Sequence, residues 1–121
     1  MTTFEIGMQL INLIKTGKSL EAMEALYAPD ILSLEAAPMP DREVRGRDKC
    51  IAKSKQWIEA HEIHSSAAEG PFPHGDKFAL ILAYDITQRA TGKRLQMKEV
   101  AIYTVANDKI VKEEFMYPTG A

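Results

Sequence analysis

The chain has 121 residues, of which 45% are hydrophobic and 26% are charged, a composition typical of a globular domain and not of a disordered segment. Its formal net charge is −2, and lysine and arginine residues form no basic stripe, so we expect no nucleic-acid partner. No apolar run is long enough to span a membrane, and we expect no membrane association. The length predicts one domain over residues 1–121.

The cysteine content indicates the compartment. Cys50 is the single cysteine, which excludes an intramolecular disulfide and is typical of a reducing environment. The opening residues, MTTFEIG, lack the basic and apolar segments of a secretory signal. We therefore expect a cytoplasmic protein.

Two helices are predicted at the start of the chain. Hydrophobic residues recur at helical spacing after Thr2 and Thr3, either of which can cap the first helix. Gly17 is placed to end this helix. Ser19 is then expected to cap a second helix, which ends before Pro29 because proline cannot continue it.

A short strand and a third helix follow. The segment ILSLEA (31–36) predicts a strand, and the prolines after it predict a loop. The third helix is expected to begin near residues 46–48 and to end at about residue 60. One face of this helix carries four residues at helical spacing, namely Cys50, Ser54, Trp57 and His61.

The rest of the chain is predicted to form strands. The first of them is expected to end at the turn-rich segment 70–76. A two-residue loop at Thr91 and Gly92 joins the next two strands, and a tight turn at Asn107 and Asp108 leads into the last one. Helices first and antiparallel strands second predict an α+β fold, with the helices packed on one face of a curved sheet.

Three segments carry a resemblance to a known family. They are LYAPDILSLEA (26–36), VRGRDKCIAKSKQWI (44–58) and VAIYTVANDKIVKEEFMY (100–117), and the last is the most specific. In this order they resemble the NTF2-like superfamily, in particular its SnoaL-like and ketosteroid-isomerase-like members. The resemblance implies a cone-shaped antiparallel sheet wrapped around the helices, with a pocket open at one end. It also implies homodimers that pair through the sheet.

Counting back from the two predicted turns gives a register for the last three strands. It places Glu99 opposite Tyr84 and Met116. A one-residue bulge would exchange the faces and bring Asp85 and Glu113 into the place of Glu99. We interpret one face as the pocket because it mixes apolar groups, hydroxyls and a carboxylate. Its residues are Leu80, Leu82, Tyr84, Ile86, Met97, Glu99, Ala101, Tyr103, Glu114 and Met116.

The candidate catalytic residues are two glutamates. Glu99 in a dry pocket would have a raised pKa and would carry protons, and the alternative is a glutamate paired with a lysine at the surface. Glu35 is an auxiliary acid at the mouth or a solvated rim carboxylate. Tyr84 and Tyr103 are hydrogen-bond donors to a ligand or structural tyrosines. The remaining substrate-binding candidates are Trp57, Met97, Met116 and His61.

Two functional hypotheses follow. The first is a domain that binds a small apolar or carbonyl-containing molecule, acting as a cofactor-independent isomerase, dehydratase or polyketide-cyclase-type acid–base enzyme. The alternative is a non-catalytic ligand-binding or protein-interaction domain that uses the same pocket. We expect no metal site, because His61 and His64 straddle a helix-to-strand junction and His74 lies in a separate turn.

Overall fold

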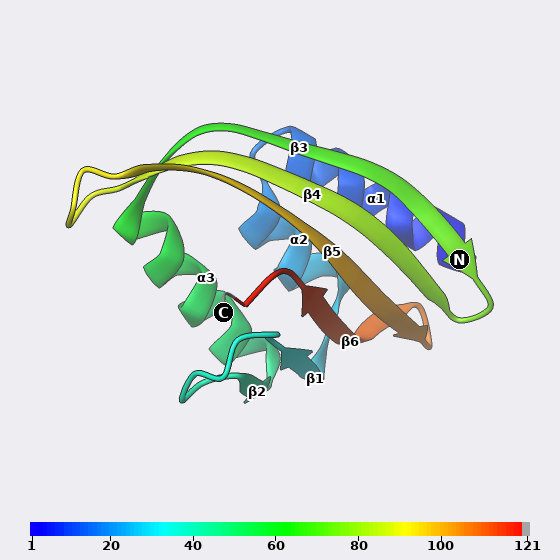
Figure 1. Ribbon diagram of the computed structural model, residues 1–121. Helices are drawn as coiled ribbons and strands as arrows, with labels where there is room; N and C mark the ends of the chain where they lie inside the picture. The colour runs from blue at the N-terminus through cyan, green and yellow to red at the C-terminus, as the bar shows by residue number, and fades with distance from the viewer. Residues whose placement is uncertain (120–121) are drawn as a thin grey trace.

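A computed structural model describes residues 1–119, which form three helices and one curved sheet of six strands (Figure 1). The helices are α1 (Thr3–Lys15), α2 (Ser19–Leu26) and α3 (Arg47–Ala60). The strands are β1 (Tyr27–Leu34), β2 (Glu43–Arg45), β3 (His61–His74), β4 (Lys77–Gln88), β5 (Arg94–Ala106) and β6 (Lys109–Met116). Their order across the sheet is β2-β1-β6-β5-β4-β3, and the fold is the expected α+β cone.

The first two helices begin differently. The Thr2 hydroxyl accepts a hydrogen bond from the Glu5 backbone N–H, and the Glu5 carboxylate accepts one from the Thr2 N–H, which together form a capping box for α1. Gly17, with φ of 75°, follows the end of that helix. Ser19 is the first residue of α2 and not its cap. Lys18 occupies the N-cap position, and no side chain caps this helix.

Strand β1 begins directly after α2, earlier than the predicted segment 31–36. It runs antiparallel to β2 and parallel to β6, while every other neighbouring pair is antiparallel. Its register against β6 shifts between Tyr27 and Leu32, where Pro29 has no N–H to donate. The parallel pairing brings the start of the chain's first strand beside its last strand.

Strand β3 is longer than the sequence pattern predicts. It continues through the segment 70–76 as far as His74, and only Gly75 and Asp76 form the turn. The register against β4 shifts between Glu69 and Phe72, and pairing then resumes. This bulge accommodates the glycine and proline that were expected to end the strand.

The hairpin of β4 and β5 has a longer loop than predicted. Leu82 stands opposite Glu99, and Tyr84 stands opposite Met97, so the register differs by two residues from the expected one. Because side chains alternate with a period of two, an even shift leaves every residue of these strands on its predicted face.

The hairpin of β5 and β6 has the predicted turn but not the predicted register. Asn107 and Asp108 have φ of 53° and 62°, as a tight hairpin turn requires. Val111 is then an extra residue in β6, since Val105 pairs with Ile110 but Thr104 pairs with Lys112. This bulge reverses the predicted faces of the rest of β6. Glu113 and Phe115 therefore face inward, and Glu114 and Met116 face outward.

The core lies between the helices and the concave face of the sheet (Figure 1). Phe78 is 1% exposed and stacks on Tyr103, with ring centroids 5.0 Å apart. The other large buried side chains include Ile6, Ile11, Ile31, Leu80, Ile86 and Ile110. Within residues 1–119 no helix has both the length and the hydropathy to cross a membrane.

Candidate functional site

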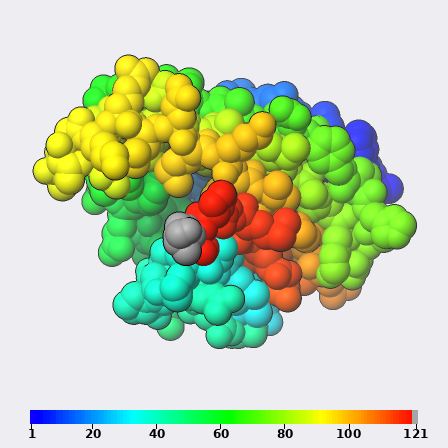
Figure 2. Space-filling model, viewed as in Figure 1, coloured from blue at the N-terminus to red at the C-terminus, as the bar shows by residue number. Residues whose placement is uncertain are grey.

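A cavity of about 780 Å³ lies between the concave face of the sheet and the three helices. Its volume is within the range of roughly 300–1,000 Å³ that small-molecule sites occupy. In the space-filling view the surface is hollowed between α3, the hairpin of β4 and β5, and the C-terminal segment (Figure 2). Much of the wall is apolar, and includes Leu10, Ile14, Met23, Leu82, Met97 and Phe115.

Glu99 lies on this wall, as the sequence predicts. Its carboxyl is partly buried, and within residues 1–119 it makes no hydrogen bond and no ion pair. Burial raises the pKa of Glu99 to about 7, and the nearby charge of Glu35 contributes to the increase. The carboxyl therefore changes its protonation state near neutral pH.

Glu113 is a second acid in the cavity, and its placement corrects the predicted register. It is 2% exposed, and the Tyr27 hydroxyl donates to both carboxylate oxygens at 2.7 and 3.0 Å. Burial raises the pKa of Glu113 to about 7, against the opposing effect of the Tyr27 hydrogen bond. From the sequence, Glu113 was expected to face inward only if a bulge shifted the register, and Tyr27 was not predicted as a site residue.

Removing the Tyr27 hydroxyl tests this pair. We expect Tyr27→Phe to raise the pKa of Glu113 further, because the lost hydrogen bond favours the ionised carboxylate. The midpoint is measured by following the Glu113 side-chain carbon in NMR spectra from pH 4 to 9. An unchanged or lower midpoint would show that the hydroxyl does not stabilise the charge.

Glu35 follows β1 at the mouth of the cavity and is held by two partners. The Tyr117 hydroxyl donates to it at 2.8 Å, and the Lys53 ammonium lies 3.3 Å from its other oxygen. Tyr117 also accepts a weak hydrogen bond from the Ala37 N–H at 3.4 Å. Lys53 and Tyr117 were not predicted as site residues, because their contacts join α3 and the C-terminal segment to the end of β1.

Tyr84 and Tyr103 line the cavity, and their hydroxyls have no hydrogen-bond partner within residues 1–119. No fully buried side-chain nitrogen or oxygen of these residues lacks a partner, so both hydroxyls open into the cavity. Burial raises the pKa of Tyr84 to about 12 and that of Tyr103 well above its usual range. Both are therefore protonated donors near neutral pH.

The other predicted binding residues divide into two groups. Trp57 and Met97 line the cavity. His61 is not part of the lining, and its ring instead stacks on Trp57 at 4.6 Å between ring centroids. Met116 is 48% exposed on the opposite face of the sheet, so its predicted place in the pocket is wrong. The bulge at Val111 is the physical reason.

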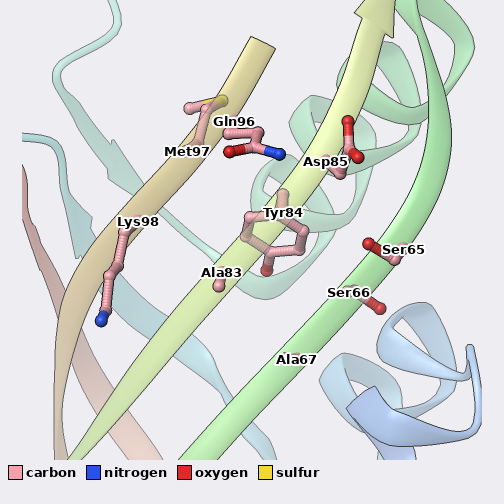
Figure 3. Close-up of a pocket in the computed structure, with 9 residues that line it drawn as sticks. All are labelled: Ser65, Ser66, Ala67, Ala83, Tyr84, Asp85, Gln96, Met97 and Lys98. Carbon is pink, nitrogen blue, oxygen red and sulfur yellow. The ribbon is translucent and has the colours of Figure 1, made fainter.

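A more open depression, of about 380 Å³, lies on the outer face of the sheet. Ser65, Asp85 and Lys98 project from β3, β4 and β5 there, while the helices lie behind the sheet (Figure 3). The Arg94 guanidinium donates two hydrogen bonds to Asp85, at 2.9 and 2.8 Å, and lowers the pKa of that carboxyl. Asp85 is thus a paired surface charge and does not replace Glu99 in the cavity.

No cluster of three or more metal-ligating side chains occurs among residues 1–119. What the cavity offers is carboxyl groups that titrate near pH 7, hydroxyl donors and an apolar wall. This combination defines a class of protein: an α+β cone that encloses a cavity of small-molecule size, lined by carboxyl and hydroxyl groups.

The family follows from the sequence. A profile of the SnoaL-like domain matches residues 1–117. The chain therefore belongs to the SnoaL-like domain family, in the NTF2-like superfamily that the three segments resemble. No curated protein matches the chain.

Solved structures agree with this assignment. A provisionally named SnoaL-like polyketide cyclase from Mesorhizobium loti shares 43% identity over 97% of this chain and 100% of that chain, with a TM-score of 0.93. An NTF2-like protein from Burkholderia thailandensis shares 23% identity over 98% and 92% of the two chains, with a TM-score of 0.84. A Catenulispora acidiphila protein with a ketosteroid isomerase-like fold, in complex with trimethylamine, shares 16% over 96% and 87%, with a TM-score of 0.75. At these identities, the last two show the fold alone.

Proposed function

We propose that the chain acts as one SnoaL-like domain that binds a small apolar or carbonyl-containing molecule and catalyses proton transfer on it without a cofactor. The observation that carries this proposal is the Glu99 carboxyl, which lines an apolar cavity and has no hydrogen-bond or ion-pair partner within residues 1–119. A carboxylate in such a place is a stronger base than one in water, because its surroundings disfavour the charge. The reaction class is isomerisation, dehydration or aldol-type cyclisation.

Each residue has a role in this reaction. Glu99 removes a proton from the carbon next to a carbonyl group and returns it at a second position. Tyr84 and Tyr103 donate hydrogen bonds to the carbonyl oxygen, where negative charge develops as the proton leaves. Glu35 is an auxiliary acid at the mouth, and Trp57 holds the apolar body of the substrate.

Proton abstraction from 5-nitrobenzisoxazole tests the proposal without knowledge of the natural substrate. The base takes the proton from C3, the C–H electrons form the nitrile, and the N–O bond breaks to give a coloured phenolate. We expect kcat/KM to rise with pH through a midpoint near 7, as Glu99 loses its proton. A rate no higher than that in buffer would remove the catalytic part and leave the alternative, a ligand-binding or protein-interaction domain.

The outer face of the sheet supports a homodimer as part of the proposal. Ile81, Ala83, Val100 and Ile102 lie together on this face and are only partly covered. Pairing of two such faces would remove their apolar surface from water. Sedimentation velocity should then give twice the chain mass of 13.5 kDa for the wild type. The Ile81→Glu variant should give the mass of a single chain. The free, buried Cys50 thiol supports the cytoplasmic location.

A further inference from the structure

The charges that line the cavity do not balance. Three carboxyls face it, from Glu35, Glu99 and Glu113, while Lys53 is the single cationic side chain on the part of the lining that the structure describes. Lys53 is already paired with Glu35 at 3.3 Å. Among residues 1–119, Glu99 has no hydrogen-bond or ion-pair partner, and Glu113 has only the neutral Tyr27 hydroxyl. Two carboxyls are therefore left without a counter-charge.

The walls around these carboxyls are aromatic. The rings of Trp57 and Tyr84 meet edge to face, with their centroids 5.6 Å apart. Ring faces attract cations, and most strongly where water is excluded. Of residues 1–119, six aromatic side chains line the cavity: Tyr27, Trp57, Tyr84, Tyr103, Phe115 and Tyr117.

The Tyr103 hydroxyl is a further polar group that a ligand in the cavity would meet. Tyr103 is 3% exposed, and its hydroxyl has no partner within residues 1–119. Every fully buried side-chain nitrogen or oxygen of residues 1–119 has a hydrogen-bond partner. The unpartnered Tyr103 hydroxyl is therefore not sealed in the core but faces the cavity. This donor can therefore bind either water or a polar atom of a ligand.

We propose that the ligand selected by this cavity carries a positively charged nitrogen on an apolar body, an inference that rests on the proposed function of the cavity as a small-molecule site. A cationic nitrogen supplies the counter-charge that Glu99 and Glu113 lack, and the aromatic rings surround it. An anionic ligand would meet two carboxyls with no free cation beside them. A neutral ligand would leave both carboxyls to hold protons.

Competition with protons makes the inference pH-dependent. Burial raises the pKa of both Glu99 and Glu113 to about 7, so a bound cation must displace their protons at lower pH. The other titratable groups that face them are Tyr27, Glu35, Cys50, Lys53, Tyr84, Tyr103 and Tyr117. Burial keeps the pKa of Cys50 and Tyr84 at about 11 and 12, outside the range of the experiment.

Three probes of one shape test the inference by fluorescence titration. They are (2-naphthylmethyl)trimethylammonium, its neutral isostere 2-neopentylnaphthalene, and the anion 2-naphthylmethanesulfonate. At pH 8 we expect the cation to bind at least roughly tenfold more tightly than the neutral isostere, and the anion to bind more weakly than both. From pH 8 to 5.5 the affinity for the cation should fall, and that for the neutral probe should not.

Variants identify the groups responsible. Glu99→Gln and Glu113→Gln should each reduce the ratio of cation to neutral affinity. Glu114→Gln is the matched control, because Glu114 is on the outer face and pairs with Lys112. Equal affinity of the cationic and neutral probes would overturn the inference while the proposed small-molecule site stands. Binding of none of the three probes would contradict both.

Discussion

Glu113→Gln should stabilise the protein at pH 8 by about 3 kcal/mol and change its stability little at pH 4.5. Burial raises the pKa of Glu113 in the folded protein from 4.5 to about 7. Between these values the folded state holds a proton that the unfolded state has released, so the free energy of unfolding falls as the pH rises. Glutamine keeps an oxygen that accepts from Tyr27, and it carries no charge at any pH.

The measurement is urea unfolding at pH 4.5, 6 and 8 for the wild type and for Glu113→Gln. The difference between the two proteins isolates the single carboxyl, because all other titrating groups are shared. Glu114→Gln serves as the control, since the neighbouring side chain points outward. Parallel pH profiles for the wild type and Glu113→Gln would mean that Glu113 is not held in its neutral form by burial.

Local patterns predict those parts of the fold that depend on local physics. The apolar period and the cap at Thr2 define α1, and helical spacing defines α3 with Cys50, Ser54 and Trp57 on the cavity side. The asparagine and aspartate of the last hairpin adopt positive φ, as their side chains permit. The observed register of β4 against β5 differs from the predicted one by two residues. Because this shift is even, Glu99 stays on its predicted face.

The bulge in β6 does not follow from local pattern. Ile110 and Val111 are both apolar, so nothing in their side chains shows which of them is the extra residue. Glu113 and Glu114 are consecutive acids, and either choice of register places one of them inside. Ile110 pairs with Val105 in both registers, so its complete burial does not distinguish them. The sequence therefore predicts an acid from this pair in the cavity but not which one.

The partners of the acids were also beyond local prediction. The Tyr27 hydroxyl meets Glu113 across 86 positions of the chain, and Tyr117 meets Glu35 across 82. Both contacts depend on β1 lying parallel to β6, a pairing that no turn connects. A register counted outward from hairpin turns cannot reach such a pair. The central carboxyl could be found from the sequence, whereas its electrostatic surroundings required the tertiary structure.

Glu99→Gln should lower kcat/KM for 5-nitrobenzisoxazole by roughly 10²- to 10³-fold, the contribution expected of a positioned general base. Glutamine has nearly the same shape as glutamate, so the apolar wall and the tyrosine donors stay in place. The pH dependence is the sharper test, because the inflection near 7 should disappear together with the rate. Glu114→Gln should keep both, since that residue lies outside the cavity. If Glu99→Gln lost less than about threefold, or kept the inflection, then another base would carry the proton. Glu113, the second cavity carboxyl whose pKa lies near 7, would then be the residue to replace.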